Sequence, residues 1–436
     1  MEIGLIHYRV GETDGVSLEM TKWKKVLEKI GFKVYLIAGD MGTSAGFKIP
    51  SISYSNTTNN FLKHKSFVDL NGWNEDQYIC EMKSYTTYIY DQLKELMNLD
   101  IMIVNNIFSL AHNPAAAMAI YHFCKDRGIK IVGHHHDFYW ERDYYANPTN
   151  SYIRRVLQMY FPPKDITHVV INSITQEKIK IENNLDSVVI PNVFDFNQEQ
   201  WEIDDYNVKI YDKLNISKND LIFLQATRIV KRKAIELAID VVSEINKDLK
   251  KYVGEKTYNG KIITENTAAK LLLPGLPEDM DYLNTLIEYA KRKNVELKLA
   301  SSICDNIRHE SKGVFSLWDF YAIADFITYP SVLEGFGNQF LEAIFSKTPI
   351  LIFEYPVYKK DIAPLGFEIV SLGNKAELKN GLYKVNQDTI IKAKDQILEI
   401  LFDTHKASES VQKNFELGRK YFSYDMLEEK LRYLIE

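Results

Sequence analysis

Two glutamates flank a glycine-containing turn in the last quarter of the chain. The turn, Gly335–Gly337, separates an apolar run at Ala324–Thr328, typical of a buried strand, from a helical pattern at Phe340–Phe345. Glycines let the backbone approach a ligand closely, and the first turn of a helix directs free N–H groups at an anion. Glu334 and Glu342 lie before and after this turn. Such a site suits a ligand with both phosphates and hydroxyls, and a sugar nucleotide is one.

A basic segment, Gln225–Lys233, contains four cationic residues. It follows the strand-like run Leu221–Leu224 and leads into a helix expected from Ala234 to Leu249. Positive charge at a helix start is opposed by the helix dipole, and a bound anion would relieve that opposition. The alternative interpretation is a basic helix start that is simply solvated.

Three consecutive histidines, His134–His136, follow the predicted strand Ile129–Val132. Neighbouring side chains on an extended backbone point to opposite faces, so the three cannot readily share one metal ion. We therefore predict no metal here. The alternatives that remain are a histidine beside a ligand and a histidine whose hydrogen bonds are satisfied within its own loop.

Three further segments carry weaker signals. Gly15 lies at the entry to a predicted helix, where it could approach a phosphate or an acceptor, although Asp-Gly is common in any tight turn. The sequence Asp279-Met280-Asp281 has the D-x-D spacing of some metal sites, but it lies in a turn that leads into a helix. The segment Pro274–Pro277 is predicted to be a loop and not a nucleotide-binding fingerprint.

The segment from Pro330 to Ala343 resembles the E-x7-E motif of the family-4 retaining glycosyltransferases, which have the GT-B fold. In that family the first glutamate contacts the donor sugar near its 3-hydroxyl and the second binds the nucleotide ribose. The resemblance implies these roles for Glu334 and Glu342. Lys347 stands where a glycine is common in the family, so we expect a departure in the loop after this helix.

The same resemblance covers most of the chain. The family's Arg-x4-Lys pair, which binds the donor diphosphate, matches Arg228 and Lys233, and Ala234 replaces the usual glycine after it. A histidine beside the donor sugar matches His136, with His135 as the fallback. The resemblance thus implies catalytic roles for His136, Arg228, Lys233 and Glu334, and donor contacts for Gly15, Arg228, Lys233, Glu334, Gly335, Phe336, Gly337, Asn338 and Glu342.

The elements that position these residues alternate between strand and helix patterns in two halves of the chain. Such alternation predicts parallel sheets covered on both faces. We predict an α/β protein with two Rossmann-like, doubly wound domains facing across a cleft, as in GT-B. The predicted domains are residues 1–196, joined by the C-terminal helix at 420–436, on the acceptor side, and residues 197–419 on the donor side. Residues 41–80 match nothing in the family and are predicted to be an irregular insertion near the cleft.

The bulk composition excludes several classes of protein. The formal net charge of −6 argues against a nucleic-acid binder, and the wide spread of charge along the chain leaves no long basic tract for anionic membranes. No apolar run approaches the length of a transmembrane helix, and the N-terminus lacks the pattern of a secretion signal. Three isolated cysteines fit a reducing compartment, and we predict a cytoplasmic location.

The sequence therefore predicts a retaining, metal-independent glycosyltransferase with no cofactor. Its donor would be a nucleoside-diphosphate hexose, linked to UDP, GDP or ADP. The predicted acceptor is a soluble hydroxyl compound: a sugar, a sugar phosphate, a glycerate-type solute or an oligosaccharide, with lipid-linked acceptors still open. The aromatic segment Phe138–Tyr145 could stack on a sugar ring, or it could pack in the core. The alternatives are a glycoside phosphorylase, a sugar-nucleotide epimerase and a non-catalytic sugar-nucleotide sensor.

Overall fold

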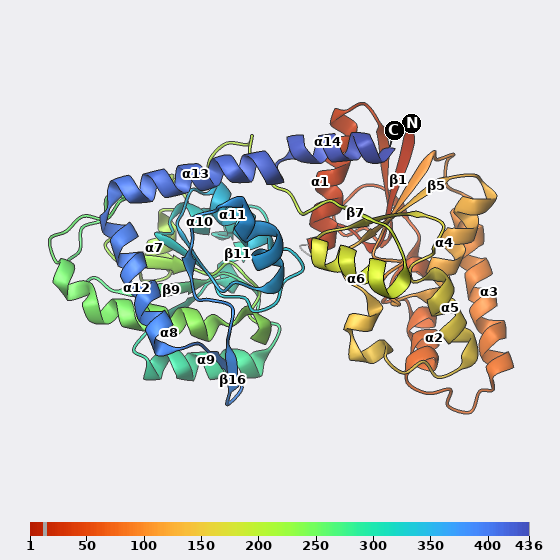
Figure 1. Cartoon of the computed structure of the whole chain (residues 1–436), viewed down its shortest axis with the longest axis horizontal. Coiled ribbons are helices and arrows are strands. Elements are labelled where there is room, and N and C mark those ends of the chain that lie inside the picture. Colours follow the sequence, from red (N-terminus) through yellow and green to blue (C-terminus); the bar gives the residue numbers. More distant parts are fainter. Residues whose placement is uncertain (12–14, 436) are drawn as a thin grey trace. The chain divides into compact units, whose positions relative to one another are not determined.

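The computed structural model describes residues 1–11 and 15–435 and divides into two compact units (Figure 1). Unit 1 contains Met1–Val193 and the C-terminal segment that begins at Tyr424, and unit 2 is Phe194–Ser423. The predicted boundaries, at residues 196 and 420, lie a few residues from these positions. Within unit 2, the Phe194 N–H donates to the Phe422 carbonyl oxygen (2.8 Å), close to both places where the chain leaves that unit.

Unit 1 is built on a seven-stranded parallel sheet with the strand order β3-β2-β1-β4-β5-β6-β7. The strands are β1 (Glu2–Arg9), β2 (Lys33–Asp40), β3 (Phe47–Lys48), β4 (Ile101–Asn105), β5 (Lys130–His135), β6 (Thr167–Val170) and β7 (Val188–Val189). The helices are α1 (Gly15–Lys29), α2 (Thr57–Phe67), α3 (Glu75–Leu93), α4 (Pro114–Asp126), α5 (Ser151–Tyr160), α6 (Ser173–Asn183) and α14 (Tyr424–Ile435).

The side chains of a strand alternate between the two faces of its sheet. In this sheet, both faces are buried. In β4, Ile101 and Ile103 join a core with α1 and α14, whereas Met102 and Val104 join a second core with α3, α4 and α5. The result is a sheet covered on both faces, as predicted.

The expectation of an irregular insertion at residues 41–80 is wrong. This segment contains β3, a 3₁₀ turn at Pro50–Ile52, the whole of α2 and the start of α3. Two of its asparagines are helix caps: the Asn56 side chain accepts from the Thr58 and Asn59 amides, and Asn74 forms a reciprocal capping box with Gln77. The polar composition of the segment therefore reflects helix starts and not irregular chain.

Unit 2 is built on a six-stranded parallel sheet with the order β10-β9-β8-β13-β14-β15. Its strands are β8 (Leu221–Leu224), β9 (Ala269–Leu273), β10 (Glu296–Leu299), β13 (Phe326–Tyr329), β14 (Ile350–Ile352) and β15 (Val370–Ser371), and two short strand pairs are β11 (Cys304–Asp305) with β12 (Phe315–Ser316) and β16 (Glu377–Lys379) with β17 (Leu382–Lys384). Its helices are α7 (Lys209–Lys213), α8 (Ile235–Asp248), α9 (Met280–Arg292), α10 (Leu317–Ala322), α11 (Asn338–Phe345), α12 (Gln387–Phe402) and α13 (Thr404–Phe422).

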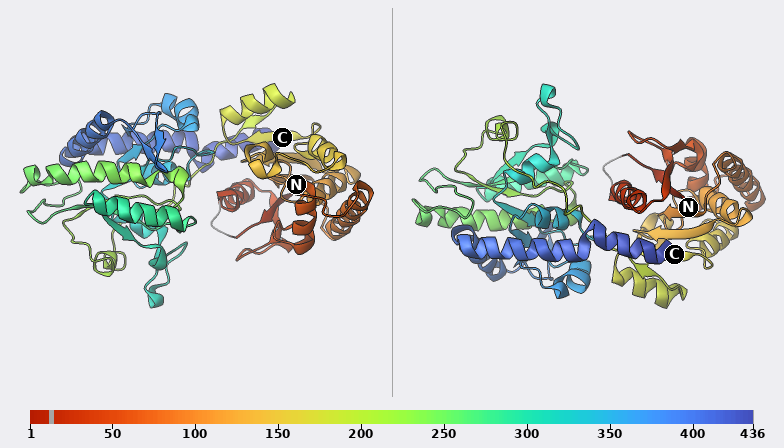
Figure 2. Two further views of the ribbon diagram at one scale, coloured as in Figure 1. Left: turned by 90° about the horizontal axis from the view of Figure 1, so that it is seen from below. Right: turned by 90° about the horizontal axis from the view of Figure 1, so that it is seen from above.

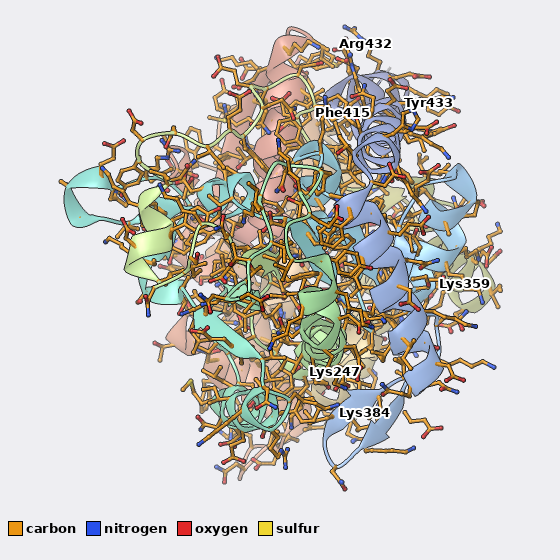
Figure 3. All side chains as sticks on the ribbon, turned by 90° about the vertical axis from the view of Figure 1, so that its left-hand side faces the viewer. Lys247, Lys359, Lys384, Phe415, Arg432 and Tyr433 are labelled. Carbon is orange, nitrogen blue, oxygen red and sulfur yellow. The ribbon has the colours of Figure 1, made fainter. Side chains whose placement is uncertain are left out.

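Helices also flank the sheet of unit 2, and two further views show the same layering in each unit (Figure 2). The predicted fold class, two doubly wound parallel-sheet domains, is confirmed. Basic side chains such as Lys247, Lys359 and Lys384 lie on the outside of unit 2 (Figure 3), where Lys247 pairs with Glu244 at 2.7 Å. Within the described parts of the chain, no helix combines the length and apolar character that a membrane span requires.

Helix α13 packs closely on α11 through Gly418. A Cβ atom at Gly418 would lie 2.6 Å from a ring carbon of Phe196 and 2.7 Å from a methyl group of Ile344. We expect Gly418→Ala to lower the free energy of unfolding by about 1–3 kcal/mol, the usual cost of overpacking. Chemical denaturation measures this loss, and Ser408→Ala on the exposed side of α13 is the control. An equal effect of both substitutions would contradict the close packing.

Candidate functional site

The two motifs of the second half of the chain meet at one point of the unit 2 sheet. Strands β8 and β13 are neighbours, and the chain runs outward from them in opposite directions along the sheet. In open parallel sheets, ligands bind at the carboxyl ends of the strands where the strand order reverses. The basic segment Gln225–Lys233 follows β8 and the glycine turn Gly335–Gly337 follows β13. This position is therefore the candidate ligand site of unit 2.

Glu334 lies between two cations at this point. One carboxylate oxygen contacts the Lys233 Nζ atom, and the other accepts from Arg232 Nη1 at 2.8 Å. Only 9% of the side chain of Glu334 or Lys233 is exposed. Burial alone would raise the pKa of Glu334, but Lys233 and Arg232 outweigh it and hold the pKa below its ordinary value. Glu334 is therefore an anion held in place by two positive charges.

The basic segment has a fixed backbone. Residues Lys231–Lys233 form a 3₁₀ turn before α8, and the Gln225 side chain donates to the Lys233 carbonyl oxygen at 3.1 Å. The Val332 amide donates to the Arg232 carbonyl oxygen at 2.9 Å, which ties the segment to the turn after β13. Ala234 has φ 45° and ψ 46°, a left-handed conformation that favours glycine. The alanine thus adopts a conformation that a glycine would take without strain.

Gly337 caps α11 with φ 123°, a conformation that only glycine adopts readily. A Cβ atom here would lie 2.9 Å from the Tyr329 hydroxyl and closer still to that of Tyr355. The Tyr355 hydroxyl donates to the Phe336 carbonyl oxygen at 2.6 Å and so holds the turn. Lys347, after the helix, has φ 52°, so it takes the left-handed conformation in place of a glycine.

Glu342 lies in α11 and accepts a hydrogen bond from the Tyr321 hydroxyl at 2.6 Å. Burial raises the pKa of Tyr321 well above its ordinary value, so this hydroxyl remains a donor at neutral pH. Sequence reasoning assigned no role to Tyr321 or to Arg232. Arg232 was noted only as one cation of the basic segment, and Tyr321 carries no local signal, because the carboxylate that each contacts is distant in the chain.

Arg228 lies at the exposed edge of the site. Its guanidinium pairs with Glu278 at 2.7 Å, and both side chains are about half exposed. The loop Pro274–Pro277 supports this region: a Cβ atom at Gly275 would overlap the Thr227 carbonyl oxygen, and the Ile229 amide donates to the Leu276 carbonyl oxygen at 2.9 Å. The loop therefore packs beneath the basic segment, as a structural support.

The sequence Asp279-Met280-Asp281 is explained by a helix cap. The Asp279 side chain accepts from the Tyr282 amide at 2.9 Å and caps α9. Across residues 1–11 and 15–435, no group of three or more histidine, cysteine, aspartate or glutamate side chains is arranged to hold a metal ion.

The three histidines of unit 1 alternate across the sheet, as predicted. The rings of His134 and His136 lie 4.3 Å apart, and His134 also stacks on Trp23. His135 points the other way and its Nε2 atom lies 3.1 Å from Nδ1 of His168. Burial lowers the pKa of His134 and of His135 well below its ordinary value, so both rings are neutral. His135 is fully buried in this pair, and His136 is the better-placed candidate for a ligand contact.

Gly15 is the first residue of α1, and residues 12–14 of the same loop lie outside the described part of the chain.

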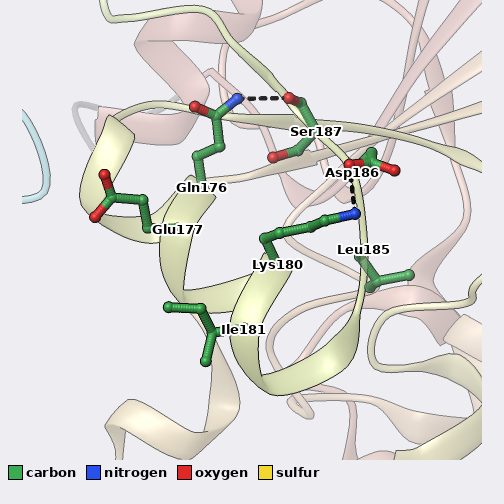
Figure 4. Close-up of a pocket in the computed structure, with 7 residues that line it drawn as sticks. All are labelled: Gln176, Glu177, Lys180, Ile181, Leu185, Asp186 and Ser187. Carbon is green, nitrogen blue, oxygen red and sulfur yellow. Dashed lines mark hydrogen bonds and ion pairs between the residues drawn. The ribbon is translucent and has the colours of Figure 1, made fainter.

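A separate pocket at the end of α6 is shown in Figure 4. Its lining residues are Gln176, Glu177, Lys180, Ile181, Leu185, Asp186 and Ser187. Two polar pairs lie across the pocket: the Gln176 side chain donates to the Ser187 carbonyl oxygen, and Lys180 pairs with Asp186 (Figure 4). Because these groups already bind each other, they offer little hydrogen-bonding capacity to a ligand.

The buried His168 predicts a loss of stability in acid. Burial lowers its pKa to about 4, whereas the unfolded chain protonates near pH 6.5. The neutral ring therefore contributes stability above pH 6.5, and this contribution is lost as the pH falls towards 4. We expect His168→Gln to reduce the drop in unfolding free energy between pH 7 and pH 5 by about 2 kcal/mol. Urea denaturation at both pH values measures it; His405→Gln, which is 89% exposed, is the control and should match the parent.

Comparison with known proteins identifies the family. Residues 208–399 match the family model described as glycosyl transferases group 1. The chain is 69% identical over 422 residues to the mannosylglucosylglycerate synthase of Petrotoga mobilis, with 97% of this chain and 98% of the relative covered. It is 40% identical over 435 residues to the mannosylglucosylglycerate synthase of Thermotoga maritima, with 99% of each covered.

A solved glycosyltransferase from Rickettsia africae has a similar fold, with a TM-score of 0.64 at 14% identity and coverage of 99% of this chain and 97% of that one. At this identity the likeness concerns the fold alone. The whole-length relatives, the matching family model and the two parallel-sheet domains agree with one another. The chain belongs to the glycosyl transferases group 1 family, and it is a glycosyltransferase with the GT-B fold.

Proposed function

We propose that this enzyme transfers a mannosyl group from a nucleoside-diphosphate mannose to glucosylglycerate. The observation that carries the proposal is the 69% identity, over 97% of the chain, to a protein named mannosylglucosylglycerate synthase. That product contains a mannosyl, a glucosyl and a glycerate part. Transfer of mannose to preformed glucosylglycerate forms this product through a single new glycosidic bond. The acceptor is then a soluble, glycerate-type compound.

In the proposed donor complex, the diphosphate lies at the N-terminus of α11. The amides of Gly335–Asn338 and the cations Arg228 and Lys233 would contact it. Lys233 and Arg232 already lie around the anionic Glu334, and Arg228 is at the exposed edge where it can exchange Glu278 for phosphate. Glu342, oriented by the Tyr321 hydroxyl, would accept from the ribose.

We propose that transfer retains the configuration at the mannosyl carbon. The bond between that carbon and the leaving phosphate oxygen breaks while the acceptor oxygen bonds on the same face. The acceptor proton passes to the departing phosphate, so a mannoside and a nucleoside diphosphate result. Arg228 and Lys233 would stabilise the leaving charge without a metal ion, and Glu334 would hold the sugar.

Variants of the basic segment test the donor site. We expect Arg228→Ala and Lys233→Ala to lower kcat by about 10²–10³-fold, because each removes a charge that stabilises the leaving group. Lys231→Ala, in the same turn with an exposed side chain, is the matched control and should remain near the parent rate. Release of nucleoside diphosphate from GDP-, UDP- or ADP-mannose with glucosylglycerate measures the rate. Near-normal turnover by Arg228→Ala would contradict the proposal.

The same assay separates the alternatives. A glycosyltransferase releases nucleoside diphosphate only when the acceptor is present, whereas a phosphorylase requires phosphate and an epimerase requires neither. A sensor would be stabilised by the donor without turnover. NMR of the new glycosidic bond gives the anomeric configuration, and an inverted product would exclude retention.

A further inference from the structure

The carboxyl edge of the unit 1 sheet has its own strand-order reversal. Strands β1 and β4 are neighbours there, with β2 and β3 on one side and β5, β6 and β7 on the other. Ligands of such sheets bind at this position. Arg9 is the last residue of β1, and His112 lies in the segment that follows β4. These two residues mark the corresponding candidate site of unit 1.

Lys63, on α2, supplies an unusual charge to this region. Its side chain is half-buried, and its Nζ atom lies 5.8 Å from the centre of the Tyr144 ring. Among the described residues, no carboxylate lies within ion-pair distance of it. Burial lowers the pKa of Lys63, which reflects the cost of removing an ammonium group from water without an anionic partner. A bound anion would offset that cost.

Two arginines lie in the same region. Arg142 pairs with Asp137 at 3.1 Å, but both side chains are about 45% exposed, so this pair is weak and can be exchanged. The Arg9 guanidinium lies over the Tyr54 ring at 5.3 Å. Burial, and then the charges of Arg142, Lys63, His7 and Arg9, lower the pKa of His112 to about 3. The imidazole is therefore neutral, and its pKa reflects these nearby cations.

Aromatic rings accompany these charges. Tyr144 is 44% exposed, and the rings of Tyr54 and His112 lie 5.6 Å apart. The Tyr145 hydroxyl and Nδ1 of His112 share a hydrogen bond of 2.6 Å, which fixes the ring. Flat apolar rings beside cations suit a ligand with a sugar ring at one end and an anion at the other.

We infer that this cluster, made of Arg9, Tyr54, Lys63, His112, Arg142 and Tyr144, is the acceptor site, where Lys63 and Arg142 bind the carboxylate of the glycerate part. The inference rests on the proposed function, which supplies an acceptor with one carboxylate. A guanidinium presents a planar fork that matches a carboxylate, and Lys63 adds a point charge.

The origin of these residues supports the assignment. Tyr54 and Lys63 come from the segment 41–80, which lies outside the residues that the family model matches, and Arg142 and Tyr144 come from the aromatic segment after β5. The family model matches residues 208–399, all within unit 2. A part of the chain that lies outside the family model is where groups specific to one acceptor are expected.

The test compares glucosylglycerate with glucosylglycerol, which lacks the carboxylate. We expect Lys63→Met and Arg142→Gln each to raise KM for glucosylglycerate roughly ten- to hundredfold, the usual effect of a lost charged hydrogen bond. Their kcat and their KM for the donor should change little, as should kcat/KM for glucosylglycerol. Lys83→Met, an exposed lysine on α3, is the control and should behave as the parent. Unchanged KM in both variants would overturn the inference while leaving the proposed function intact.

Calorimetric titration with glucosylglycerate, in the presence of nucleoside diphosphate, gives a readout that does not depend on turnover. Binding by the parent that is lost in the Lys63→Met, Arg142→Gln double variant supports the inference. Equal binding by both overturns it. If the parent neither binds nor mannosylates glucosylglycerate, the proposed function fails, and the inference fails with it. Unaltered donor KM in the variants shows that they are folded.

Discussion

The carboxylate of Glu334, buried between Lys233 and Arg232, is the interaction on which the unit 2 site depends. Removing charges from water is costly unless each finds a partner, so this group of three fixes where the two loops lie relative to each other. The backbone bond from Val332 to Arg232 and the ring of Tyr329 beside Lys233 restrict the same loops. The site is thus organised before any ligand arrives, and a preorganised set of charges is what stabilises a leaving anion most effectively.

Two replaced glycines show how strongly this geometry is imposed. Ala234 and Lys347 both adopt left-handed backbone conformations, which cost about 1–2 kcal/mol for residues with a Cβ atom. The packing around them must outweigh that cost: Ala234 is completely buried, and the Lys347 ammonium lies 4.5 Å from the centre of the Phe415 ring. Gly337 has no such substitute, since a side chain would collide with two tyrosine hydroxyls. The motif therefore specifies a backbone path first and residue types second.

Sequence patterns predicted most of the fold because they depend on local periodicity. The alternation of strands and helices gave both sheets, and the alternation of side chains along β5 placed His135 on the face opposite His134 and His136. Contiguous motifs singled out Glu334 and Lys233, and the structure brings these two side chains into contact. Arg232 and Tyr321 received no role of their own because the glutamates that they contact are brought close only by folding. Residues 41–80 were misinterpreted because asparagine marks helix caps as well as irregular loops.

The two sheets place unlike chemistry at equivalent positions. Each has its candidate site where the strand order reverses, so the backbone supplies the location in both units. In unit 2 the cations Arg228 and Arg232 pair with carboxylates from neighbouring loops, and the proposed diphosphate would compete with these carboxylates as it binds and leaves. In unit 1 the half-buried Lys63 has no carboxylate partner among the described residues, so its charge favours a ligand that carries a carboxylate. Under the proposed function, a fold that separates these demands keeps one donor site while the loops of the other unit change the acceptor.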